Sequence, residues 1–107
     1  MVHVIATIQL QDGTREAFLD HFRQIVSAVR AEDGCLQYEG TVDLQTGLGA
    51  QPPLRDDAMT VVEQWRDLAA LKAHLAAPHM IAYRERVKAM VIRTTLHVLT
   101  PVPGNPD

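Results

Sequence analysis

Four stretches of the chain alternate between hydrophobic and polar residues, which is the pattern of a β-strand with one buried face. They span residues 2–10, 35–43, 59–65 and about 91–99. The first is the clearest, because one of its faces is entirely apolar: Val2, Val4, Ala6, Ile8 and Leu10. In the third, one face would carry Met59, Val61, Glu63 and Trp65. The sequence therefore predicts that Glu63 and Trp65 point the same way.

Apolar residues at helical spacing follow the first strand. Asp12-Gly13-Thr14 has the composition of a turn, with Thr14 as the N-cap, and the buried stripe would consist of Phe18, Phe22, Ile25 and Val29. The helix is expected to stop near residues 32–34, where Gly34 can adopt the left-handed conformation that ends helices. The second strand then resumes the alternation, with one side made of Leu36, Tyr38, Gly40 and Val42.

Two shorter helices are predicted between the third and fourth strands. Asp67 is a good N-cap for the first of them, whose apolar face would carry Leu68, Leu71 and Leu75, with His74 at its margin. Pro78 ends this helix and suits the first position of the next one, which runs to about residue 89. The core stripe of that helix would consist of Met80, Tyr83, Val87 and Met90.

The order strand, helix, strand, strand, helix pair, strand is typical of an α+β, ferredoxin-like fold, the split βαβ arrangement. It predicts a four-stranded antiparallel sheet with its helices on one face. The other face would still show Ile5, Val62 and Leu99, so we expect a homodimer that joins two such sheets.

Residues 1–100 are expected to form this domain and residues 101–107 a proline-rich tail. Residues 44–57 read as a long loop, either a lid or a solvated connection.

Length and charge narrow the setting. With 107 residues the chain makes one domain, which buries roughly two thirds of its unfolded surface. The net charge of −3 gives no reason to expect nucleic acid or an anionic membrane as a partner. We recognise no leader, and no apolar run approaches the roughly 20 residues that span a bilayer. Because Cys35 is the sole cysteine, an internal disulfide is excluded, which fits a reducing cytoplasm. Cys35 has no basic neighbour in the sequence, so an inert thiol is favoured over a nucleophile.

Candidate chemistry gathers between residues 59 and 83. This stretch holds a carboxylate, an indole, two imidazoles and a phenol: Glu63, Trp65, His74, His79 and Tyr83. They fall at a strand end and on the two helices after it, where they could line a small pocket. Each also has a structural interpretation, since the indole could be a core aromatic, the carboxylate could pair with an arginine and His79 could be exposed. Tyr38 and Tyr83 occupy core positions, and for both we favour packing over a hydrogen bond to a substrate.

Two segments carry a family resemblance. Residues 33–38, DGCLQY, and residues 63–79, EQWRDLAALKAHLAAPH, resemble the signature of the antibiotic biosynthesis monooxygenase family, which has G-C-L-x-Y on the second strand and E-x-W followed by a helical histidine. The resemblance extends over about residues 2–92. It implies a dimeric α+β barrel. As in characterised members, it also implies cofactor-independent oxidation of quinols or polycyclic aromatic phenols by O2, with no bound metal or flavin.

The chain departs from some members of that family. Haem-degrading and some polyketide-oxidising relatives place an asparagine in the pocket, often on the first strand. The only asparagine here is Asn105 in the tail, and the first strand carries Ala6 and Thr7. This argues against haem degradation, although His74 falls near the histidine that ligates iron in those relatives. The histidines also show no i, i+4 pair on a single helix, so we expect no metal site and no cofactor.

The resulting hypothesis is a cofactor-independent monooxygenase. A hydroxylated aromatic ring held against Trp65 would lose a phenolic proton to His74, assisted by Glu63, and the phenolate would reduce O2. The other residues expected to contact the substrate are Tyr38, Tyr83 and His79. Two alternatives use the same pocket: an isomerase or other proton-transfer enzyme, and a small-molecule binding module without turnover. Consumption of O2 separates the first interpretation from both.

Overall fold

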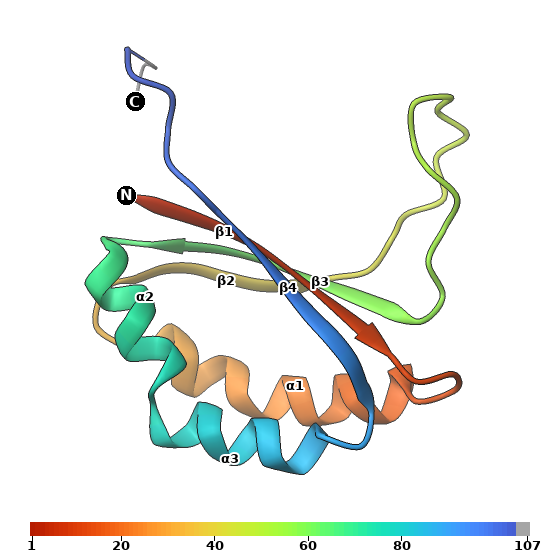
Figure 1. The fold of residues 1–107 in the computed structure, drawn as a ribbon, viewed down its shortest axis with the longest axis horizontal. Coiled ribbons are helices and arrows are strands. Elements are labelled where there is room, and N and C mark those ends of the chain that lie inside the picture. The colour runs from red at the N-terminus through yellow and green to blue at the C-terminus, as the bar shows by residue number, and fades with distance from the viewer. Residues whose placement is uncertain (105–107) are drawn as a thin grey trace.

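The computed structural model describes residues 1–104 and consists of one antiparallel sheet with three helices on one of its faces (Figure 1). The sheet has the strand order β2-β3-β1-β4, and every pair of neighbouring strands is antiparallel. This arrangement confirms the predicted ferredoxin-like α+β fold. The elements are β1 (Val2–Leu10), α1 (Arg15–Arg30), β2 (Cys35–Thr41), β3 (Ala58–Trp65), α2 (Leu68–Leu75), α3 (Pro78–Val87) and β4 (Val91–Leu99).

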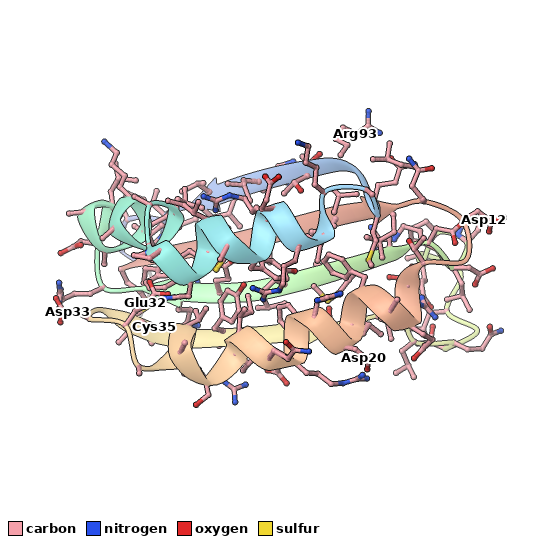
Figure 2. The ribbon with its side chains drawn as sticks, turned by 90° about the horizontal axis from the view of Figure 1, so that it is seen from below. Asp12, Asp20, Glu32, Asp33, Cys35 and Arg93 are labelled. Atoms are coloured by element: carbon pink, nitrogen blue, oxygen red, sulfur yellow. The ribbon has the colours of Figure 1, made fainter. Side chains whose placement is uncertain are left out.

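The core lies between the sheet and its helices, where α1 and α3 run side by side (Figure 2). The predicted apolar face of β1 is buried from Val4 to Leu10, and it meets the buried stripe of α1. As predicted, that stripe consists of Phe18, Phe22, Ile25 and Val29. Thr14 occupies the N-cap position but gives α1 no side-chain cap, because its hydroxyl donates to the Gln11 carbonyl instead, at 2.7 Å.

A register shift in β2 changes one predicted face. Cys35 pairs with Trp65 and Gln37 pairs with Gln64, so the residue between them is a bulge. Cys35 and Tyr38 therefore both face the helices, whereas Leu36 is exposed. The prediction that Leu36 shares a face with Tyr38 was wrong, because strict alternation does not survive a bulge.

The rotation of α2 also differs from the prediction. The Asp67 carboxylate caps the helix as expected, accepting from the Ala70 backbone N–H at 2.8 Å. The buried positions, however, are Ala70, Leu71 and His74, whereas Leu68 is half exposed. The helix is anchored at its start, since the Arg66 N–H donates to the Gly34 carbonyl at 2.8 Å. This rotation places His74 fully inside the protein rather than at the margin of the apolar face.

A tight turn at residues 32–35 joins α1 to β2 beneath α2. Gly34 has a φ of +82°, a conformation that other residues adopt only with strain. A Cβ at this position would lie 2.6 Å from the Ala70 Cβ. The glycine that the sequence suggested as a helix terminator therefore also lets the turn approach α2 closely.

The long connection between β2 and β3 projects from the sheet (Figure 1) and contains no helix or strand, as predicted for residues 44–57. It is fastened where it leaves the sheet, because the Arg55 guanidinium donates to both Asp43 carboxylate oxygens, at 2.7 and 3.0 Å. The predicted tail, 101–107, ends beyond the described residues. Within the described part of the chain, no helix is long and apolar enough to cross a membrane.

Replacing Gly34 tests the turn. We expect Gly34→Ala to lower the free energy of unfolding by about 2 to 4 kcal/mol, because backbone strain and an overpacked contact with Ala70 add together. The matched control is Gly47→Ala in the long loop, where φ is +74° but no atom lies within 4 Å of the added Cβ. Gly47→Ala should lower the free energy of unfolding only by the backbone strain, about 1 kcal/mol. Urea denaturation measures the free energy of unfolding of both variants. Equal losses in the two variants would contradict the close packing of the turn.

Candidate active site

A cavity of about 330 Å³ lies between the helix-facing side of the sheet and helices α2 and α3. Its wall is mostly apolar, with contributions from Ala6, Ile8, Phe18 and Val61. Polar side chains reach it from several elements: Tyr38, Glu63, His74 and Tyr83, together with Arg84, Lys88 and Thr94. An apolar cavity with a few convergent polar groups is the usual form of a small-molecule site.

Glu63 is a buried carboxyl held by a single tryptophan. The alternation of β3 places both on the helix side, and the Trp65 indole N–H donates to Glu63 Oε1 at 2.8 Å. Glu63 is only 5% exposed. Burial raises the pKa of Glu63 to about 7, against the lowering effect of the indole hydrogen bond, and the nearby Glu32 carboxylate raises it further. Glu63 can therefore give or take a proton near neutral pH.

His74 is held on three sides. Its Nδ1 lies 3.0 and 3.2 Å from the two Glu32 carboxylate oxygens. Its ring packs on Trp65 with centroids 4.6 Å apart and meets the edge of Tyr38 at 5.5 Å. Burial lowers the pKa of His74, while the hydrogen bond and charge of Glu32 act in the opposite direction. A neutral imidazole at the cavity is the result, which is the form that accepts a proton.

Tyr38 and Tyr83 are both core residues and cavity residues. Tyr38 stacks on Phe22 with centroids 5.7 Å apart, and Tyr83 packs against Phe18 at 6.0 Å. Burial raises the pKa of each phenol, so both keep their protons. Both residues line the cavity. Both can donate to a ligand.

Two predicted substrate-binding residues do not line this cavity. Trp65 has no exposed surface and lies behind His74 and Glu63. This corrects the expectation of an indole wall, because the face of the ring is covered by the imidazole. His79 lies at the start of α3 and binds Glu32, with Nε2 2.7 Å from Oε2. It therefore supports the site from outside the cavity.

The residue that sequence reasoning missed is Glu32. We expected Glu63 to assist His74, but the carboxylate hydrogen-bonded to the imidazole comes from the turn after α1. The sequence holds one indication that Glu32 has a partner. A carboxylate next to a helix C-terminus is disfavoured by the helix dipole, so an acid at that position suggests a partner elsewhere. No periodic pattern identifies that partner, because His74 is 42 residues away in the sequence.

No group of three or more His, Cys, Asp or Glu side chains within residues 1–104 is arranged to hold a metal ion. Burial, followed by the charges of Glu32 and Glu63, raises the pKa of the Cys35 thiol, which disfavours the reactive thiolate.

Comparison with known proteins places this geometry in a family. Residues 1–86 match the family described as antibiotic biosynthesis monooxygenase. The chain belongs to this family. It is 41% identical over 103 residues to "Probable quinol monooxygenase YgiN" of Escherichia coli strain K12, an alignment that covers 94% of this chain and 98% of that protein.

Solved structures of family members and relatives have the same fold. PA3566 from Pseudomonas aeruginosa aligns with a TM-score of 0.79 at 30% identity, covering 94% of this chain and 93% of that one. Rv0793 from Mycobacterium tuberculosis aligns with a TM-score of 0.78 at 25% identity, covering 98% of each chain. Membership of the antibiotic biosynthesis monooxygenase family supports a cofactor-independent monooxygenase.

The raised pKa of Glu63 makes stability depend on pH. Since the folded state binds the Glu63 proton more tightly than the unfolded chain does, this group favours folding at low pH. The contribution is lost as pH rises from about 4.5 to about 7. Glu63→Gln keeps an acceptor for the Trp65 N–H but cannot ionise. We expect its free energy of unfolding to rise by about 3 kcal/mol relative to that of the wild type when the pH is raised from 4 to 8.5.

Urea denaturation at the two pH values measures this difference. The exposed Glu85→Gln on α3 serves as the control and should show no such change. A wild-type-minus-variant difference that stays constant with pH would mean that Glu63 ionises in the folded protein as easily as in water.

Proposed function

We propose that this protein is a cofactor-independent monooxygenase that oxidises a small quinol or hydroxylated aromatic with O2. The observation that carries the proposal is that the His74 imidazole, with its Nδ1 bound to Glu32, lies on the wall of a mostly apolar cavity of about 330 Å³. That volume suits a substrate of one or two rings. The relative named as a quinol monooxygenase, at 41% identity, supports the choice of substrate class.

The substrate is oriented by the polar groups of the cavity. A phenolic hydroxyl donates to His74 Nε2, since Nδ1 is engaged by Glu32. Tyr38 and Tyr83 donate to a second oxygen of the substrate, and the apolar wall holds the ring and excludes water. Glu63, whose pKa is about 7, is protonated in part at neutral pH and can donate to an oxygen intermediate.

The reaction balances without a cofactor. His74 accepts a hydroxyl proton, the phenolate gives one electron to O2, and the two radicals combine to form a carbon–oxygen bond. The peroxide then takes a proton and becomes a ring hydroperoxide. Loss of the ring C–H proton breaks the O–O bond and releases water. A quinol and O2 thus give a hydroxyquinone and water, with all four electrons supplied by the substrate.

One feature of the cavity also fits a second reaction class. Glu63 and His74 both line the cavity and are both able to transfer protons, as an isomerase that shifts a proton next to a carbonyl requires. Such an enzyme would act without O2. Oxygen uptake therefore distinguishes the two functions.

We further propose that the protein acts as a cytoplasmic homodimer. The sheet face opposite the helices carries Ile5 and Val62, which pair with each other across β1 and β3 and are only partly buried. A second sheet packed on this face would cover them. The single cysteine, which cannot form an intrachain disulfide, fits a reducing compartment.

The proposed function is tested by following O2 uptake with a panel of quinols, under air and under nitrogen. We expect wild-type protein to consume O2 and His74→Ala to lose roughly 10²- to 10⁴-fold in kcat, the usual contribution of a general base. The control is His21→Ala, a half-buried histidine of α1 that does not line the cavity. Unchanged turnover by His74→Ala would remove His74 from this role, and conversion under nitrogen would favour the isomerase.

A further inference from the structure

Glu32 touches the proposed catalytic histidine on the side that faces away from the cavity. Its backbone is fixed in the turn, since its N–H donates to the Val29 carbonyl at 3.0 Å and its carbonyl accepts from the Cys35 N–H at 3.1 Å. The side chain is 13% exposed and lies where the end of α1 meets the start of α3 (Figure 2). Glu32 is not part of the cavity wall. It can act on a substrate only through His74.

One oxygen of this carboxylate serves two histidines. Glu32 Oε2 lies 3.0 Å from His74 Nδ1 and 2.7 Å from His79 Nε2. A carboxylate only accepts hydrogen bonds, so each of these ring nitrogens must carry a hydrogen. The arrangement therefore selects the tautomer of His74 in which Nδ1 is protonated and Nε2 holds the free electron pair.

The His74 ring cannot easily turn to present the other nitrogen. It is 2% exposed and lies between the Trp65 indole and the Tyr38 phenol. With Nδ1 bound to Glu32, the nitrogen left for the cavity is Nε2. A carboxylate behind the ring also stabilises the imidazolium that forms when the substrate proton arrives.

We propose that Glu32 is a positioning residue for His74, which fixes the tautomer with Nε2 free and directed to the cavity, and that His79 holds the Glu32 carboxylate in place. The proposal rests on the proposed function for its kinetic consequence only. The tautomer itself is a property of the protein without substrate.

Removing the charge of Glu32 has a predictable effect on the pH profile. Glu32 raises the pKa of His74, so its loss lets burial lower that pKa further. Because the neutral imidazole is the active form, the acid limb of kcat/KM should move to lower pH while the plateau falls. The titratable or charged groups that face His74 come from four parts of the chain: Glu32, Tyr38, Glu63, His79 and Arg84.

The first experiment determines the tautomer. Protein labelled with 15N on histidine is examined by long-range proton–nitrogen NMR at pH 7.5, and we expect a single His74 tautomer with Nδ1 protonated. In Glu32→Gln the amide can accept from Nδ1 or donate to it, so we expect the tautomers to mix. The control is Asp33→Asn, which removes an exposed carboxylate one residue away that pairs with Arg66. A single unchanged tautomer in Glu32→Gln would overturn the proposal.

The second experiment measures kcat/KM against pH for the same variants. The plateau value of kcat/KM should fall about 10- to 100-fold in Glu32→Gln, which is less than the full contribution of a general base. The acid limb of the profile should shift to lower pH. A lower plateau with an unmoved acid limb would show a merely structural role and contradict the proposal. If no quinol is turned over by the wild type, the proposed function fails, and the NMR result still decides the role of Glu32.

Two variants of His79 test whether this residue holds the Glu32 carboxylate in place. Glutamine keeps an N–H that can donate to Glu32, whereas leucine has none. We expect His79→Leu to lower the plateau several-fold and His79→Gln to restore most of it. If His79→Leu behaves like the wild type in rate and in the His74 tautomer, His79 does not hold Glu32.

Discussion

The burial of the His74 ring against the Trp65 indole is the contact on which the site depends. An imidazole inside an apolar layer is stable only when its polar atoms are hydrogen-bonded or face a cavity. Here one nitrogen meets Glu32 at 3.0 Å, and the ring closes one side of the cavity. The same contact removes Trp65 from the cavity wall and leaves its N–H to hold Glu63. The positions of both proton-transfer groups therefore follow from one packed pair of rings.

This arrangement places polar chemistry where a small domain would otherwise gain stability from apolar packing. Glu63 with a pKa of about 7 is a destabilising residue whenever it ionises, and an apolar side chain would pack at that place without this cost. Functional sites commonly retain such residues at the expense of stability. The aromatic neighbours, from Phe18 to Tyr83, supply the compensating packing around the cavity. The fold thus surrounds Glu63 and His74 with packed apolar and aromatic side chains.

The sequence predicted the elements, their order and the face of β3 because these depend on periodicity, which survives in the folded chain. It failed at Leu36, where a bulge breaks the alternation, and at Leu68, because in a two-turn helix several stripes are equally consistent with helical spacing. The rotation of α2 is fixed by long-range contacts with the turn at Gly34, and those have no periodic signature. Glu32 was missed for the same reason. Residues within an element could be predicted, whereas partners from a turn could not.

The geometry of the cavity requires that a hydroxylated ring bind with its hydroxyl on His74. A crystal structure of the protein with a phenol that O2 does not oxidise, such as 2-naphthol, tests this requirement. We expect the ring between the sheet and α3, with the phenolic oxygen about 2.6 to 3.2 Å from His74 Nε2. A ring bound elsewhere, or one bound in the cavity with its hydroxyl turned away from His74, would show that His74 is not the proton acceptor.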